Sequence, residues 1–336
     1  MKSLIKNTLY YTLYYTGLVH LFLKAYWLRR KNYPVVILTY HRIVKDYSRE
    51  VNTAKSINHP VENFRKEMQF LKKWFNVVSL DEVAAIIKGK KPADKPTVAI
   101  TIDDGFDDNY SLAYPVLKSL GLPATIFLTA GCINTSRLPW VEELDEAFAA
   151  TDRESMQLNS VFKNKVFALR TLKQKQSAYE YIVPKLKHLT YSKRREIIAD
   201  ISQALGVPKT FKRRMLNWQE VKEMAENNIT FGAHTMTHPI LSRMSLFDAK
   251  KEIFDSKQVI ERALNKPVKH FAFPNGRLED FSPELKAYCK DIGFESICAC
   301  AYGPNRQDAD VFMLRRISPG RNFPTFVIDL IRSFYR

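Results

Sequence analysis

Carboxylates and histidines that could act together in catalysis occur at the ends of predicted strands. Residues 100–110 read ITIDDGFDDNY, and Asp103 and Asp104 directly follow the apolar run TVAITI. His234 follows the apolar stretch ITFGA, and His238 comes four residues later. A divalent ion such as zinc accepts imidazole and carboxylate ligands and, in catalytic sites, keeps a position open for water and substrate. The sequence therefore predicts a metal site built from the two histidines and one of the two aspartates.

The two adjacent aspartates are expected to differ in role. Neighbouring residues of a strand point to opposite sides, so Asp103 and Asp104 cannot easily be equivalent ligands. One can bind the metal while the other accepts a proton from the attacking water, and the metal would then neutralise one of the crowded carboxylates. The second pair, Asp107 and Asp108, lies past Gly105, where acidic residues stabilise the beginning of a helix. We expect that structural role for the second pair.

These residues can meet only if their strands lie side by side. The chain alternates apolar, strand-like runs with helix-like segments, beginning with VVILTY at residues 35–40. About seven such units favour a (β/α) barrel over an open sheet, and a barrel gathers its site at the carboxyl ends of the strands. His41, which follows the first run, would then lie near the aspartates. The alternation stops between residues 137 and 215, and this basic, helix-favouring stretch predicts a helical insertion.

Two of these segments also resemble motifs of a known family. TIDDG at residues 101–105, followed by HTMTHP at residues 234–239, resembles the first two motifs of polysaccharide deacetylases with a NodB homology domain, carbohydrate esterase family 4. The resemblance extends from Val35 to Ile317 apart from the insertion. It implies an α/β fold, a distorted (β/α)7 barrel. The implied activity is a hydrolase that removes acetyl groups from N-acetylated sugars of a cell-surface polysaccharide.

The resemblance also implies roles for single residues. Asp103 would be the general base, and Asp104, His234 and His238 would hold a divalent metal. Zinc is the metal expected, with Co²⁺, Ni²⁺ or Fe²⁺ as alternatives. The family's late Leu-x-x-His motif is absent from the C-terminal third, but residues 38–41 read LTYH. This resembles the permuted branch of the family that acts on poly-N-acetylglucosamine, and it implies that His41 is the general acid.

The third motif of the family departs from its usual form. The arginine that orients the base is replaced by Ala272 in the sequence FAFPNG. Arg277 or Arg42 could take its place, and Arg42 is also expected at the substrate or oxyanion. The backbone amide of Asn275, after Pro274, is expected to stabilise the oxyanion, because this role needs no side chain. The fourth motif, with its Asp and Trp, is not found.

The net charge of +17 is confined to two segments. Residues 1–31 contain six Lys or Arg and no acid, and residues 161–215 contain fourteen basic and three acidic residues, so the remainder is neutral. Such basic segments favour an anionic polymer or membrane surface as partner. No nucleic acid is expected, because the insertion matches no nucleic-acid motif and lacks interleaved aromatic residues.

The N-terminal segment predicts a helix at a membrane surface. Residues 7–23 carry no formal charge, but this run is short of the ~20 apolar residues that a membrane-spanning helix needs. Four tyrosines lie within the run, and Tyr26 and Trp27 follow it; such side chains favour the membrane interface. We expect residues 1–31 to associate peripherally with a membrane, and the sequence does not indicate on which side of the membrane. The alternative is a helix packed on the enzyme. Residues 32–336 would form the barrel, with residues 137–215 as its insertion.

Three other functions compete with N-deacetylation. A glycosidase could use the aspartates as an acid–base pair, although this leaves both histidines unexplained. An O-acetyl esterase would use the same fold and the same attack by water. A catalytically weak protein could instead bind an anionic polymer through the basic insertion.

Overall fold

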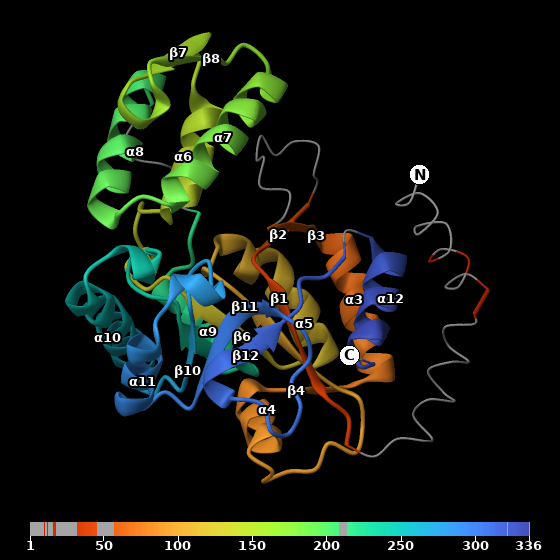
Figure 1. Cartoon of the computed structure of the whole chain (residues 1–336). Coiled ribbons are helices and arrows are strands. Elements are labelled where there is room, and N and C mark those ends of the chain that lie inside the picture. Colours follow the sequence, from red (N-terminus) through yellow and green to blue (C-terminus); the bar gives the residue numbers. More distant parts are fainter. Residues whose placement is uncertain are drawn as a thin grey trace.

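A barrel of parallel strands forms the centre of the computed structural model in Figure 1. The structure describes residues 10, 12, 16–17, 32–45, 57–207, 214–320 and 322–335. Within these residues, seven parallel strands follow one another around the barrel. In spatial order they are β1 (Val35–Tyr40), β5 (Thr97–Ile102), β6 (Ala124–Leu128), β9 (Ile229–Ala233), β10 (His270–Ala272), β11 (Ser296–Tyr302) and β12 (Leu314–Arg316).

The first and last strands of this order nearly close the barrel. The amide of Thr39 donates to the carbonyl of Ile317, directly after β12, at 3.0 Å, and the amide of Ile317 donates to the carbonyl of Ile37 at 2.8 Å. A further short strand, β4 (Asn76–Val78), pairs with the first half of β5. The distorted (β/α)7 barrel that the sequence predicts is therefore confirmed.

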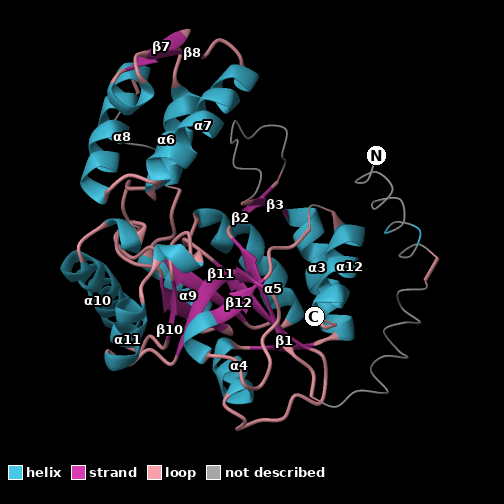
Figure 2. Cartoon of the chain, viewed as in Figure 1, coloured by secondary structure: helices cyan, strands magenta, loops and turns pink. Residues whose placement is uncertain are grey.

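Helices surround the barrel on its outside (Figure 2). Strands β1, β5 and β6 are buried along their whole length, which explains why they read as continuous apolar runs without alternation. Helices α4 and α9 each begin with a capping box, from Ser79 and Asn217 respectively. The outer helices are α3 (Val61–Trp74), α4 (Leu80–Ile87), α5 (Tyr114–Leu120), α9 (Trp218–Ala225), α10 (Leu246–Leu264), α11 (Pro283–Asp291) and α12 (Phe323–Ser333).

A second group of elements, here called the helical cap (residues 140–205), interrupts the chain between β6 and α9. It has a hydrophobic core of its own, which includes Leu144, Phe148, Ile182 and Ile198. In Figure 1 the cap lies above the barrel, on the side where β1 leads into β2 (Arg42–Val44) and its partner β3 (Asn58–Pro60). Its elements are α6 (Trp140–Ala150), β7 (Ser155–Leu158), β8 (Lys165–Ala168), α7 (Leu172–Lys187) and α8 (Tyr191–Leu205).

The cap occupies most of the stretch for which the sequence predicts a helical insertion, and the antiparallel hairpin of β7 and β8 was not expected there. The domain limits at residues 31, 137 and 215 stay predictions.

The predicted N-terminal helix lies mostly outside the described residues. Tyr10, which is described, is buried, and its hydroxyl accepts a hydrogen bond from Arg332 of α12. Among the helices that the structure describes, none is both long enough and apolar enough to cross a membrane.

Candidate metal centre and active site

The carboxyl ends of three strands bring the predicted site residues together. Asp103 and Asp104 follow β5, His234 follows β9, and His41 follows β1. The strand hydrogen bonding continues past the strand ends, because the amide of Asp103 donates to Tyr40 and that of His234 donates to Leu128, each at 2.9 Å. The parallel register therefore sets these side chains at one end of the barrel, where barrel enzymes carry their sites.

Asp104, His234 and His238 form a compact group of three potential metal ligands. Oδ1 of Asp104 lies 3.2 Å from Nε2 of His238 and 3.5 Å from Nε2 of His234. The three donor atoms all lie within 4.8 Å of one another. Two imidazole nitrogens and one carboxylate oxygen match the ligand types of a catalytic zinc site.

The hydrogen bonds of His234 prepare it for metal binding. Its Nδ1 lies 2.7 Å from the carbonyl oxygen of Ala272, which can only accept, so Nδ1 carries the proton. The lone pair of Nε2 therefore faces Asp104, as in metal sites where a second group fixes the tautomer of a histidine ligand. Ala272 stands where the resemblance led us to expect an arginine, and its backbone contributes to the site.

The electrostatics of the three residues also fit a cation. Burial, together with Asp103 and Glu142, raises the pKa of Asp104 well above its usual value. Burial lowers the pKa of His234 to about 4, and it lowers the pKa of His238 well below its usual value. Oδ1 of Asp104 is buried and has no hydrogen-bond partner among the described residues. A divalent cation held by these atoms would satisfy this oxygen and offset the cost of burying the carboxylate.

Asp103 takes a different partner from Asp104. Arg316, the last residue of β12, is completely buried and donates from two nitrogens to the two oxygens of Asp103 at 2.7 and 2.8 Å. Its Nε donates to the carbonyl of Ala299 at 3.3 Å, and this bond fixes the plane of the guanidinium. Two parallel charge-assisted bonds orient a carboxylate more strictly than a single bond does. The adjacent aspartates therefore have the unlike environments that the sequence predicts.

Arg316 is the functional residue that sequence reasoning missed. The expectation that Arg42 or Arg277 takes the place of the motif arginine is wrong. Arg277 is largely exposed and lies 3.8 Å from Glu279. The sequence did contain a signal for Arg316, because it lies in the short strand-like stretch Leu314-Arg315-Arg316. An arginine of a strand whose side chain points into the barrel core needs a buried acid as its partner.

Asp103 and His41 are close enough to exchange a proton through a small movement. Burial raises the pKa of Asp103, but Arg316, His234 and His41 outweigh burial, and the net pKa is lowered. Nε2 of His41 lies 3.9 Å from Oδ2 of Asp103, and a quarter of the His41 side chain is exposed. Burial lowers the pKa of His41, and the opposing effect of Asp103 does not cancel the shift. These shifts favour an ionised Asp103 and a neutral His41 at neutral pH.

The second carboxylate pair lies at the beginning of a helix, as the sequence predicts, and Asp108 is a buried member of it. Asp108 makes no capping bond with its side chain. Its carboxylate accepts from Nε of Arg42 at 2.9 Å and from the amide of Ile43 at 3.1 Å. Burial raises the pKa of Asp108 to about 6 in spite of Arg42. Arg42, expected at the substrate or oxyanion, is thus bound to Asp108 and ties the segment after His41 to the loop that follows β5.

Several residues of the candidate site have a left-handed backbone conformation. Asp104, Thr235, His238 and Asn275 have φ values of 75°, 68°, 55° and 59°. Such left-handed conformations cost non-glycine residues about 1–3 kcal/mol each, and a β-branched threonine is an especially rare case. The surrounding structure must therefore hold these residues in place.

Glu252 of α10 supplies part of this support for the loop that carries His234 and His238. Its carboxylate accepts from the amides of Met236 and Thr237 at 2.8 and 2.9 Å and from the hydroxyl of Thr237 at 2.7 Å. The hydroxyl of Thr235 accepts from the amide of His238 at 3.1 Å. Nothing in the spacing of the sequence pointed to Glu252, because its partners are backbone amides of a distant loop.

The loop after β10 connects the site to the cap. Pro274 accepts from the amide of Gly276 at 2.6 Å, and the side chain of Asn275 accepts from Nζ of Lys187, at the end of α7, at 2.6 Å. The other end of the Asn275 amide donates to Asp280. A side chain at Gly276 would place its Cβ 2.9 Å from the carbonyl of Phe273. The cap therefore touches the loop on which the predicted oxyanion donor lies.

Loss of one ligand is expected to abolish stoichiometric metal binding. His234→Ala removes a fixed imidazole nitrogen, so it should bind less than one equivalent of zinc at concentrations that saturate the unaltered protein. Metal content after dialysis measures this. His188→Ala, which removes an exposed histidine of the cap, is the control and should keep full zinc content. Unchanged stoichiometry in His234→Ala would remove this residue from the ligand set.

Comparison with known proteins identifies relatives over most of the chain. A family model described as polysaccharide deacetylase matches residues 90–297. The chain is 22% identical over 294 residues to a protein described as putative polysaccharide deacetylase YxkH from Bacillus subtilis (strain 168). That match covers 86% of this chain and 74% of the relative.

Solved structures share the fold. The chain is similar to the Streptococcus pyogenes deacetylase PplD in complex with acetate, with a TM-score of 0.60 and 18% identity over 90% of this chain and 99% of that one. It is also similar to IcaB from Ammonifex degensii, with a TM-score of 0.57 and 16% identity over 89% of this chain and 98% of that one. At such identities the likeness concerns the fold alone.

Proposed function

Because the chain belongs to the polysaccharide deacetylase family, and is therefore a hydrolase, we propose that it removes acetyl groups from N-acetylated sugars of a cell-surface polysaccharide or glycan in a metal-dependent reaction. One observation carries the proposal. The adjacent aspartates are divided between a bidentate arginine and a cluster of two histidines. This division provides one ionised carboxylate for proton transfer beside a separate place for a divalent cation.

Asp104, His234 and His238 would hold the metal, with zinc as the ion that their donor types favour. A divalent ion there supplies Lewis-acid chemistry: it polarises the acetamide carbonyl and makes the attacking water more acidic. Asp103 accepts the proton as the water oxygen bonds to the carbonyl carbon. Arg316 holds the Asp103 carboxylate ionised and oriented for this step.

The proton that Asp103 accepts can then be transferred to the leaving amine. His41 lies 3.9 Å from Asp103, so a proton received by the carboxylate can pass to the imidazole and from there to the sugar nitrogen. The carbon–nitrogen bond breaks as that nitrogen is protonated, and the products are acetate and a free amino sugar. We propose the backbone amide of Asn275 as the donor to the oxyanion, held in place by the bond from Lys187 to its side chain.

The competing functions differ in what they leave unexplained. A glycosidase would have no use for the histidine pair, and it does not fit the family. An O-acetyl esterase needs the same attack by water but less help for the leaving group, so His41 distinguishes the two chemistries. A polymer-binding protein would not need Arg316 to hold Asp103 ionised.

Acetate release by the purified, zinc-loaded chain tests the proposal. Chito-oligosaccharides and fragments of surface polysaccharide should release acetate together with an equal amount of new free amine, and a chelator should stop both. O-acetylated glycans, from which acetate appears without amine, are the comparison. Release from O-acetylated glycans alone would replace N-deacetylation by esterase activity. No release from either would overturn the proposal.

Peripheral attachment to an anionic membrane surface stays a separate proposal. Its support is the composition of residues 1–31, which combine six basic residues with tyrosine and tryptophan and contain no acid. Binding to vesicles that contain phosphatidylglycerol, compared with a chain that starts at residue 32, would test it.

A further inference from the structure

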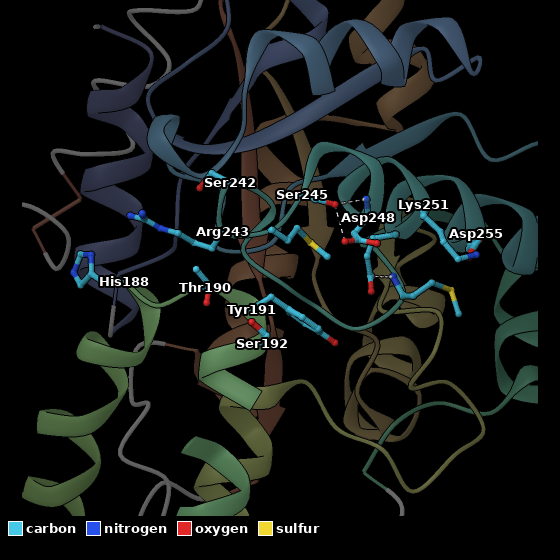
Figure 3. A pocket seen from close by; sticks show the side chains of 13 residues that line it. His188, Thr190, Tyr191, Ser192, Ser242, Arg243, Ser245, Asp248, Lys251 and Asp255 are labelled. Atoms are coloured by element: carbon cyan, nitrogen blue, oxygen red, sulfur yellow. Dashed lines mark hydrogen bonds and ion pairs between the residues drawn. The ribbon is translucent and has the colours of Figure 1, made fainter. Parts of the chain in front are cut away.

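Two cavities open where the helical cap meets the barrel. The larger has a volume of about 830 Å³ and lies between the first turn of α8 and the start of α10. Figure 3 shows Thr190 and Tyr191 of the cap facing Ser242 and Arg243 of the barrel across it. The smaller cavity, of about 480 Å³, shares Tyr191 and Met236 with the larger one. The two are therefore neighbouring compartments of one cleft.

The cleft borders the candidate metal centre. Met236 and Thr237, which line the smaller cavity, are residues of the loop between His234 and His238. A glycan whose acetamido group reaches the metal centre would therefore have neighbouring units within reach of the cleft. The cap side of the same cavity carries Trp140, Arg194 and Arg195.

Arg194 is the unusual residue of this cleft. Its side chain is only 1% exposed, and two of its guanidinium nitrogens have no hydrogen-bond partner among the described residues. The guanidinium lies 5.0 Å from the ring centre of Trp140, which stabilises the cation but does not accept its N–H groups. A buried charge without a hydrogen-bonded partner is costly, so such groups are normally paired.

The surroundings of Arg194 are positive rather than neutralising. Burial, with contributions from Arg243 and Arg195, lowers the pKa of Arg194 to about 10, and only Tyr191 opposes this shift. Arg195 is paired with Glu143 at 2.8 Å. Arg243, which lines the larger cavity, has a buried Nε that also lacks a partner among the described residues. The beginning of α8 adds the positive end of a helix dipole to this side of the cleft.

The larger cavity is lined by Asp248, Glu252 and Asp255, whereas the smaller one is lined by Arg137, Arg194 and Arg195 with Glu143 as its acid. We propose that the smaller cavity is a subsite for an anionic group of the glycan substrate, with the Arg194 guanidinium as its anchor. The inference rests on the proposed deacetylase function and narrows its substrate to a glycan that carries phosphate or carboxylate groups near the acetylated sugar. Either group presents two oxygens to the planar fork of an arginine. The anion would supply the acceptors that Arg194 lacks.

Kinetics with matched substrates test this subsite in the full, zinc-loaded chain. Chitotetraose is the neutral substrate. A tetrasaccharide alternating N-acetylglucosamine with glucuronic acid carries carboxylates, and an N-acetylglucosamine oligomer with phosphodiester links carries phosphates. We expect Arg194→Met to lower the ratio of kcat/KM for a charged substrate to that for chitotetraose by roughly 10- to 100-fold, the effect of losing hydrogen bonds to a charged group. The charged substrate that shows the loss identifies the anion.

Two further variants keep the test decisive. Lys193→Met removes an exposed charge from the same helix and should keep the ratio of the unaltered protein. Arg194→Lys keeps the charge beside Trp140 but loses the fork, so it should give an intermediate ratio and replaces Arg194→Met if that variant does not fold. Equal ratios in all variants would overturn the subsite.

A binding measurement separates this inference from the proposed activity. Titration with inorganic phosphate, followed by calorimetry, should show weaker binding in Arg194→Met than in Lys193→Met, whether or not acetate is released from any substrate. If the chain releases acetate but Arg194→Met and Lys193→Met bind phosphate equally and show equal substrate ratios, the deacetylase activity is supported and the anionic subsite is wrong. If Arg194→Met binds phosphate more weakly but no substrate releases acetate, the anion site is supported and the proposed deacetylase activity is wrong.

Discussion

Asp103→Asn is expected to lower kcat for acetate release by roughly 10²- to 10⁴-fold, the range that a positioned general base contributes. The asparagine amide cannot accept the proton from water at neutral pH. Zinc content should stay at one equivalent, because both oxygens of Asp103 bond to Arg316 and not to the ligand group. Turnover and metal content are measured on the same preparation.

Asp107→Asn is the matched control for this substitution. It removes the same charge from the same loop at a partly exposed position, so it should keep both turnover and zinc. Retained turnover in Asp103→Asn would assign the base to another group. Loss of zinc in Asp103→Asn would instead make Asp103 a ligand, which the geometry of the site speaks against.

Arg316→Met is expected to lower the free energy of unfolding by about 3–5 kcal/mol, because it leaves the Asp103 carboxylate buried without its partner. Turnover should fall as well, since no other residue that the structure describes bonds to both oxygens of Asp103. Denaturant unfolding and acetate release measure the two effects. Arg315→Met, which removes the exposed neighbouring charge, should change neither by a comparable amount.

Combining the two substitutions tests the pair itself. A chain with both Asp103→Asn and Arg316→Met contains no unpaired buried charge at this position, so it should be more stable than the sum of the two single losses implies. Arg316→Lys keeps the charge without the bidentate fork and should lie between the unaltered chain and Arg316→Met. Strictly additive losses in the double variant would mean that the two side chains do not stabilise one another.

Local patterns predicted the barrel and the side chains at its strand ends. Buried parallel strands appear as apolar runs, and the positions that directly follow them, such as Asp103, Asp104 and His234, can be read without any knowledge of distant contacts. The spacing of His234 and His238 likewise belongs to one short loop. The hairpin of the cap escaped notice because its two strands are short and lie within a stretch of strong helix formers.

Pairings between distant segments could not be predicted in this way. Arg42 begins a short strand and Arg316 ends one, and the surrounding sequence does not indicate which aspartate each arginine will meet. The structure pairs Arg42 with Asp108 and Arg316 with Asp103. Asp108 begins a helix, as the sequence predicts, but its bond to Arg42 could not be predicted, since the two residues lie 66 positions apart in the chain.

By itself the sequence determined which residue types are available for chemistry: a carboxylate and two imidazoles of the kind that bind a metal, and a second carboxylate of the kind that accepts a proton. These are properties of residue types and of spacing along one strand or loop. Only the tertiary structure decided which partner each aspartate has and what the cap contributes. Both depend on which side chains the closure of the barrel and the docking of the cap bring together. Arg316 reaches Asp103 because β12 closes against β1. Arg194 lines the same cavity as the loop between His234 and His238 because the cap folds back over the strand ends.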